Sequence, residues 1–114
     1  MIDFRKIYCA PFYTDSYGSY IWTANDQMAF MNDDDRVDEK DIQPIVDKMN
    51  GFSADKFENI KKLDEETILI NDKIRLVVRG FGHLTSSHGL NLNFEDAVQV
   101  QSDFITWTID ELKK

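Results

Sequence analysis

Cysteine and basic residues are scarce in this chain of 114 residues, and each shortage excludes a class of protein. The single cysteine, Cys9, cannot form an internal disulfide, and no cysteine cluster is present for zinc. Its apolar neighbours favour a small buried side chain over a nucleophile. Thirteen lysines and arginines stand against 21 aspartates and glutamates, a net charge of −8. This charge argues against direct binding to nucleic acid or to anionic membrane surfaces.

Long hydrophobic runs are also absent. No apolar stretch approaches the roughly 20 residues of a membrane-spanning helix, and the first residues lack the apolar segment of a signal peptide. We therefore expect a cytoplasmic protein. Hydrophobic residues make up 42% of the chain and charged residues 30%, which is typical of a globular protein. The length fits a single domain over residues 1–114 that buries roughly 65% of the surface of its unfolded chain.

Two strand patterns open the chain. Ile7 to Tyr13 is apolar and aromatic but contains Pro11, which cannot donate to a ladder. It therefore predicts an edge strand, or a strand broken at the proline. The run "SYIWTANDQMAFM" predicts a hairpin with Asn25-Asp26 at its tip, because Asn and Asp tolerate the left-handed backbone of tight turns.

A helix is predicted next, because apolar residues recur at helical spacing in Ile42, Ile45, Val46 and Met49. Gly51 stands where a left-handed C-terminal cap belongs. Pro44 favours a helix whose first turn opens at Asp41, with Asp38 to Asp41 as a separate tight turn.

The second half of the chain follows the same order. "TILINDKIRLVVRG" predicts a hairpin with Asn71-Asp72 at its tip, and a short strand near Glu58 to Lys62 would extend its sheet. A final helix is predicted from Phe94 to about Leu112, with Asn93 as N-cap. Together these segments predict an α+β domain. Its antiparallel sheet has about five strands in two hairpin-loop-helix halves, with two helices packed on one face.

Both histidines lie in "RGFGHLTSSHGLN", Arg79 to Asn91. A catalytic or ligand-binding loop would use His83, Thr85, Ser86, Ser87 and His88. His83 and Thr85 match half of the signature of two-histidine phosphodiesterases, but the second half is missing, as are a third metal ligand and a G-x-S-x-G elbow. The favoured interpretation is an ordered connecting loop whose glycines relieve backbone strain. We assign no catalytic residue, no cofactor and no metal.

The acidic run from Asn32 to Asp41 has the composition of a calcium loop but not its order. Val37 falls where a third ligand belongs, and no glycine follows it. A solvated turn is therefore favoured. The run is nevertheless the densest negative stretch of the chain, so Asp33, Asp34, Asp35 and Asp38 are the first candidates for contact with a basic protein.

The final helix supplies the other candidates. Its predicted apolar face consists of Phe94, Ala97, Val98, Phe104, Ile105, Ile109 and Leu112, with Gln101 and Thr108 inside it. Gln101 would hold the glycine loop through its amide. Val100 and Trp107 lie on a flank beside Asp103. An exposed tryptophan on an acidic flank would be an interface hot spot, whereas the alternative is that Trp107 packs against a neighbouring loop.

The order "YIWTANDQMAFMND…IVDKMN" followed by "IRLVVRGFGHLTSSHGLNLNFEDAVQVQSDFITWTIDEL" resembles small α+β proteins of gut bacteria and of their phages or mobile elements. The likeness covers most of the chain and is sharpest in "RGFGHLT…GLNLNFEDAVQVQSDF". The group has no assigned activity, so the resemblance implies a phage or mobile-element accessory protein and identifies no site residue.

The leading hypothesis is a non-enzymatic, acidic protein-binding domain. An inhibitor of a defence or nucleic-acid-handling protein fits this charge, because Asp and Glu can occupy a basic groove meant for phosphates. A second hypothesis is a small-molecule or nucleotide-binding enzyme that uses the Gly80 to Gly89 loop. A third is a structural homo-oligomer, such as a homodimer that pairs through the Pro11 edge strand or the last helix.

Overall fold

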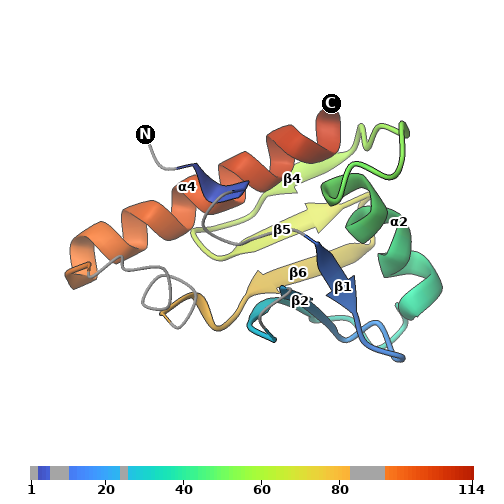
Figure 1. Cartoon of the computed structure of the whole chain (residues 1–114), viewed down its shortest axis with the longest axis horizontal. Helices are drawn as coiled ribbons and strands as arrows, with labels where there is room; N and C mark the ends of the chain where they lie inside the picture. The colour runs from blue at the N-terminus through green and yellow to red at the C-terminus, as the bar shows by residue number, and fades with distance from the viewer. Residues whose placement is uncertain (1–2, 6–10, 24–25, 83–91) are drawn as a thin grey trace.

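An antiparallel sheet with helices α2 and α4 forms most of the computed structural model, which describes residues 3–5, 11–23, 26–82 and 92–114 (Figure 1). The strands are β1 (Phe12–Thr14), β2 (Tyr20–Thr23), β3 (Met28–Asn32), β4 (Ile60–Lys62), β5 (Thr67–Ile70) and β6 (Ile74–Val78). Helix α2 (Glu39–Met49) follows β3, and helix α4 (Phe94–Lys113) ends the chain.

The six strands lie in the order β1-β2-β3-β6-β5-β4, and every neighbouring pair is antiparallel. The first three strands form one half of the sheet and the last three the other, with β3 against β6 at the centre. The prediction of an α+β fold with an antiparallel sheet is confirmed, although the sheet has six strands rather than about five. β4 is the short strand predicted near Glu58 to Lys62.

Turn and edge positions follow from local sequence chemistry. β1 is an outer strand and begins directly after Pro11, while residues 7–10 of that predicted segment lie outside the described residues. Asn71 and Asp72 at the tip of the second hairpin both have a φ of 56°, which is the left-handed region predicted for them. In the first hairpin Asp26 has a φ of 59°, and its neighbour at position 25 lies outside the described residues.

Helix α2 begins earlier than the sequence predicts. Its N-cap is Asp38, so a start at Asp41 after a separate turn is wrong. A capping box explains the start, because the Asp38 carboxylate accepts a hydrogen bond from the Lys40 N–H at 3.1 Å, and the Asp41 carboxylate accepts one from the Asp38 N–H at 3.2 Å. Pro44 lies inside the helix on its exposed side, where water can satisfy the carbonyl that loses its partner.

The predicted apolar stripe of α2 is buried, and Gly51, just after the C-cap residue Asn50, has the predicted left-handed backbone with a φ of +79°. The Gly51 N–H donates to Lys48 O at 3.1 Å and the Phe52 N–H to Asp47 O at 2.8 Å. These two bonds form a Schellman cap, which satisfies carbonyls at the end of the helix.

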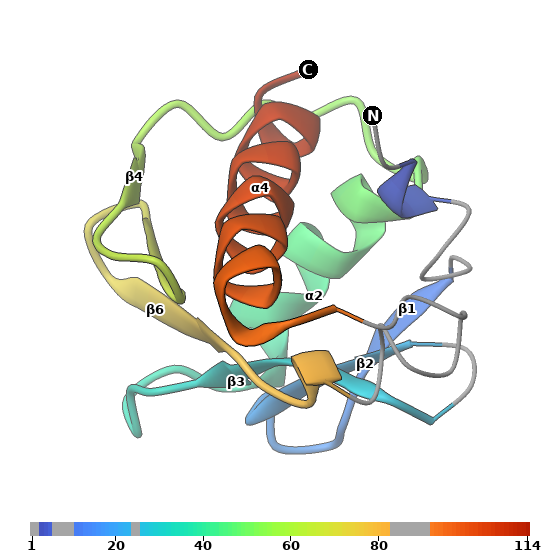
Figure 2. The same ribbon diagram turned by 90° about the vertical axis from the view of Figure 1, so that its left-hand side faces the viewer.

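Both helices cover the same side of the sheet (Figure 2). The apolar side chains of α2, α4 and this sheet face form one core. Phe30 of β3 stacks on Phe104 of α4 within it, with ring centroids 5.3 Å apart and an interplanar angle of 17°. Both side chains are fully buried, so this contact fastens the last helix to a central strand.

Helix α4 has the predicted bounds, and the Asn93 side chain caps it by accepting from the Asp96 N–H at 2.8 Å. Its buried face differs from the prediction. Phe94 is 83% exposed and Val98 38% exposed, because the N-terminal end of α4 extends beyond the strands (Figure 1). Within the described ranges, no helix combines the length and apolar character needed to cross a membrane.

Candidate functional site

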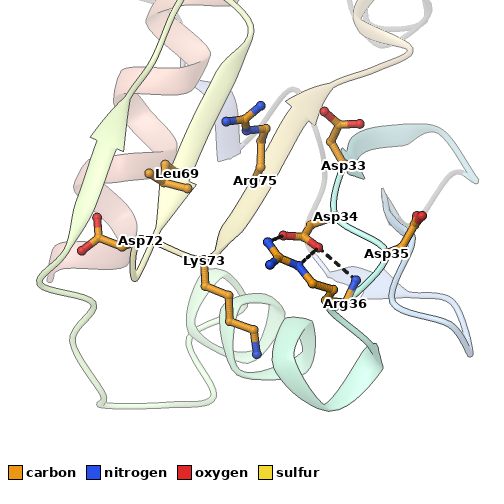
Figure 3. Close-up of a pocket in the computed structure, with 8 residues that line it drawn as sticks. All are labelled: Asp33, Asp34, Asp35, Arg36, Leu69, Asp72, Lys73 and Arg75. Carbon is orange, nitrogen blue, oxygen red and sulfur yellow. Dashed lines mark hydrogen bonds and ion pairs between the residues drawn. The ribbon is translucent and has the colours of Figure 1, made fainter.

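The acidic segment after β3 borders an open hollow with a volume of about 710 Å³ (Figure 3). The segment lines one side of the hollow with Asp33, Asp34, Asp35 and Arg36, and the β5–β6 hairpin lines the other with Leu69, Asp72, Lys73 and Arg75. The Asp33 N–H donates to Arg75 O at 2.9 Å, which holds the two sides together. Three of the predicted partner-binding residues therefore meet at one place.

Asp34 is occupied by a structural contact inside this segment. Its carboxylate accepts hydrogen bonds from Arg36, at 3.0 Å from Nε and 2.8 Å from Nη2, and from the Arg36 backbone N–H at 2.9 Å (Figure 3). The Arg36 side chain, and next its backbone N–H, hold the pKa of Asp34 well below its usual range. Asp34 therefore closes a tight turn and is neutralised by Arg36.

Asp38 and Asp41 are occupied in a similar way by the capping box of α2. The backbone N–H of Asp38 is the main cause of the lowered pKa of Asp41, and Lys73 adds to it from 3.7 Å. Lys61 lies 3.7 Å from Asp72 at the hairpin tip. Since Arg36 and Lys73 accompany Asp34 and Asp41, the acidic run is a less negative surface than its sequence indicates.

Trp107 and Val100, the candidate contacts on the flank of α4, are packed against the rest of the domain. Val100 is 8% exposed. The Trp107 ring stacks on Phe104 with centroids 5.9 Å apart, lies 5.9 Å from the Phe4 ring, and has the Arg5 guanidinium 5.6 Å from its centroid. The packing alternative for Trp107 is therefore the one that the structure supports, with the N-terminal residues as its neighbours.

Asp103, the remaining candidate on α4, is exposed and belongs to a longer feature. Asp96, Asp103 and Asp110 recur every seven residues, so they form one line on the outer side of the helix with steps of about 10 Å. The Gln99 amide donates to Asp103 at 2.9 Å. No lysine or arginine occurs from residue 94 to 112. We call this line, together with the exposed Phe94 and Val98, the acidic face of α4.

The glycine-loop candidates His83, Thr85, Ser86, Ser87 and His88 lie outside the described residues. The Gln101 amide donates to Glu65 O in the β4–β5 turn at 3.0 Å. Its predicted contact with the glycine loop falls on residues outside the described part of the chain. Among the described residues, no group of three or more His, Cys, Asp or Glu side chains is placed to hold a metal ion.

Sequence reasoning missed one surface altogether. Tyr13, Tyr20 and Trp22 project from β1 and β2 on the sheet face that carries neither α2 nor α4. The signal was present, because Tyr20 and Trp22 alternate with Ile21 and Thr23, which are both 1% exposed. The sequence predicts both helices on one face of the sheet, and the pairing of β1 with β2 shows that these aromatic side chains share the opposite face.

No protein-family model, curated protein or solved structure matches the chain.

Proposed function

We propose that the chain is a non-enzymatic protein-binding domain whose acidic surface binds a basic protein. The acidic face of α4 carries the proposal. It presents three aspartates in line with no lysine or arginine from residue 94 to 112, and it ends in the most exposed large hydrophobic side chain described, Phe94. Carboxylates orient a basic partner and accelerate encounter, and an exposed aromatic supplies the apolar contact that carries affinity.

The kind of partner follows from the shape of this charge. A straight line of carboxylates spaced by about 10 Å suits a basic groove or helix that ordinarily contacts phosphates. The domain is therefore proposed as an accessory or inhibitor protein, of the kind made by phages and mobile elements. Its target would be a defence or nucleic-acid-handling protein.

The other two hypotheses have less support. The enzymatic one rests on residues 83–91, outside the described part of the chain, so it stays a prediction from the sequence. A homodimer through the Pro11 edge strand is disfavoured, because the Asn50 side chain already bonds to the backbone N–H and C=O of Phe12 in β1.

A quantitative pull-down from native lysate tests the proposal. The test variant is Asp103→Asn with Asp110→Asn, and the matched control is Asp55→Asn with Glu58→Gln. Both remove two negative charges from exposed positions, but the control residues lie in the loop between α2 and β4. We expect wild type and control to retain one basic protein that the α4 variant loses.

Two further results bear on the identity of the partner. If the captured protein handles nucleic acid, the domain should displace DNA or RNA from it, and added salt should weaken the complex. Equal capture of the same partner by the α4 variant and the control would show that the acidic face of α4 is not the binding surface.

A further inference from the structure

The face of the sheet turned away from α2 and α4 carries no described helix (Figure 2), and we call it the open face. The cross-strand pairs identify which side chains lie on this face. Tyr13 pairs with Trp22 and Trp22 with Met28, while Tyr20 pairs with Met31 and Met31 with Val77. Six aromatic and aliphatic side chains therefore form two adjacent rows across four strands.

The composition of the open face is that of an interface core. Tyr, Trp, Met and Arg are the residue types enriched in such cores, and Arg75 and Arg79 are exposed on β6 and just beyond its end. Tyr13 is 38% exposed, and the other two aromatics are partly exposed. Tyr20 and Trp22 hold each other edge to face with centroids 5.9 Å apart. Of the six side chains in the two rows, Val77 is 7% exposed and the other five are partly exposed or exposed.

The charges beside these rows indicate which partner fits. Asp33 and Arg75 are neighbours across β3 and β6, since the Asp33 N–H donates to Arg75 O at 2.9 Å. Figure 3 draws both side chains at the hollow, and no interaction joins them. Neither side chain has a hydrogen bond or ion pair with another described residue. The pKa of Asp64 is lowered mainly by a hydrogen bond from the Glu66 backbone N–H and then by those from Thr67. The charge of Arg75 is a smaller cause of the same shift.

We propose that the open face is the interface of a two-fold homodimer. The rotation axis runs parallel to the strands between β3 and β6, so β3 of one copy lies over β6 of the other. Met31 then lies over Val77 of the second copy, and Tyr20 lies over Thr67. Val77 and Thr67 are each only 7% exposed in one copy, so Met31 and Tyr20 supply more of the newly buried area. Asp33 meets Arg75 of the second copy, and the symmetry repeats this ion pair. The two sheets stack face to face about 10 Å apart, as in a β-sandwich.

This arrangement is compatible with the acidic face of α4. Because α4 lies on the opposite side of the sheet (Figure 2), the dimer presents one acidic line on each outer surface. Two equivalent sites on one particle would raise the apparent affinity for a repetitive or oligomeric basic partner.

A charge-swap series measured by sedimentation equilibrium tests the dimer. We expect wild type to dimerise with rising concentration, and Asp33→Arg and Arg75→Asp each to weaken the dimer by at least tenfold, because each places like charges in contact. The double variant that carries both changes should restore the wild-type dimer constant, since it re-forms the pair in reverse. Asp55→Arg and Lys56→Asp, singly and together, are matched controls on an exposed loop and should leave the dimer unchanged.

Circular dichroism and urea unfolding verify that each variant is folded, which is expected because both side chains are exposed. A wild-type chain that stays monomeric up to its solubility limit would overturn the proposal. So would a dimer that tolerates both single changes, or one that the double swap fails to restore, because the contact would then lie elsewhere. These outcomes are independent of the α4 experiment, which removes charges on the other side of the sheet.

Discussion

The side-chain amide of Asn50 closes the outer edge of β1 at Phe12. Its Oδ1 accepts a hydrogen bond from the Phe12 N–H at 2.7 Å, and its Nδ2 donates to Phe12 O at 2.7 Å. Asn50 is also the C-cap residue of α2. One residue therefore ends a helix and occupies backbone groups that would otherwise be open to another strand, which is how natural sheets avoid pairing edge to edge.

Replacing Asn50 with alanine should lower the free energy of unfolding by about 1–2 kcal/mol, because two part-buried backbone groups lose their partners. Urea unfolding followed by circular dichroism measures the change. Asn59→Ala is the matched control, since Asn59 is exposed and makes no side-chain hydrogen bond to a described residue. A similar loss in both variants would mean that the amide does not hold the edge.

Two glycines with the same backbone conformation should respond differently to alanine. Gly18 and Gly51 have φ values of +71° and +79°, so either substitution pays about 1–2 kcal/mol for a left-handed residue. A Cβ at Gly18 would also lie 2.4 Å from the Asp38 carbonyl carbon, whereas one at Gly51 would meet nothing within 4 Å. The melting temperature of Gly18→Ala should therefore be well below that of Gly51→Ala. Equal melting temperatures would contradict the close approach of the β1–β2 turn to the start of α2.

The turn at Asp34 should contribute to acid sensitivity. The pKa of Asp34 is lower in the folded chain than its ordinary value of about 4, first through the Arg36 side chain and then through its backbone N–H. A lowered folded pKa stabilises the fold above the ordinary value, and this contribution is lost as the pH falls below it. Arg36→Gln should raise the Asp34 midpoint in an NMR titration of side-chain carboxyls. An unchanged midpoint would show that Arg36 does not cause the lowered pKa of Asp34.

Trp107 and Phe94 should separate stability from binding. Trp107→Ala removes the ring packed between Phe4, Phe104 and Arg5 and should destabilise the domain by about 2–4 kcal/mol. Phe94→Ala should change stability by less than about 0.5 kcal/mol, because the side chain is 83% exposed. With a purified partner, Phe94→Ala should weaken binding even though the chain stays folded. A stable Trp107→Ala variant would contradict the packing described for that ring.

Much of the fold could be read from short-range patterns. Both hairpins, the C-terminal cap at Gly51 and the bounds of α4 depend on residues a few positions apart, and all are confirmed. The predicted start of α2 is wrong for a reason that is also local. The helix-breaking tendency of Pro44 predicts a start at Asp41, but the capping box of Asp38 and Asp41 outweighs it, because an exposed proline sacrifices only one hydrogen bond.

The surfaces were harder to predict because they depend on distant partners. Lys73 reaches Asp41 at 3.7 Å from a hairpin 32 positions further along the chain, and no local pattern reveals that ion pair. Helical periodicity placed Phe94 on the buried face, but α4 extends past the strands at that end (Figure 1). The sequence left an exposed and a packed Trp107 as alternatives, because the neighbours that decide between them, Phe4 and Arg5, come from the opposite end of the sequence.

The most direct test of the central claim is the dissociation constant of the purified basic partner, measured by calorimetry at several salt concentrations. Wild type and the Asp55→Asn, Glu58→Gln control should bind equally. The Asp103→Asn, Asp110→Asn variant should bind about three- to tenfold more weakly and with a shallower salt dependence, since two charges no longer contribute. The same constant and the same salt dependence in all three proteins would contradict binding through the acidic face of α4.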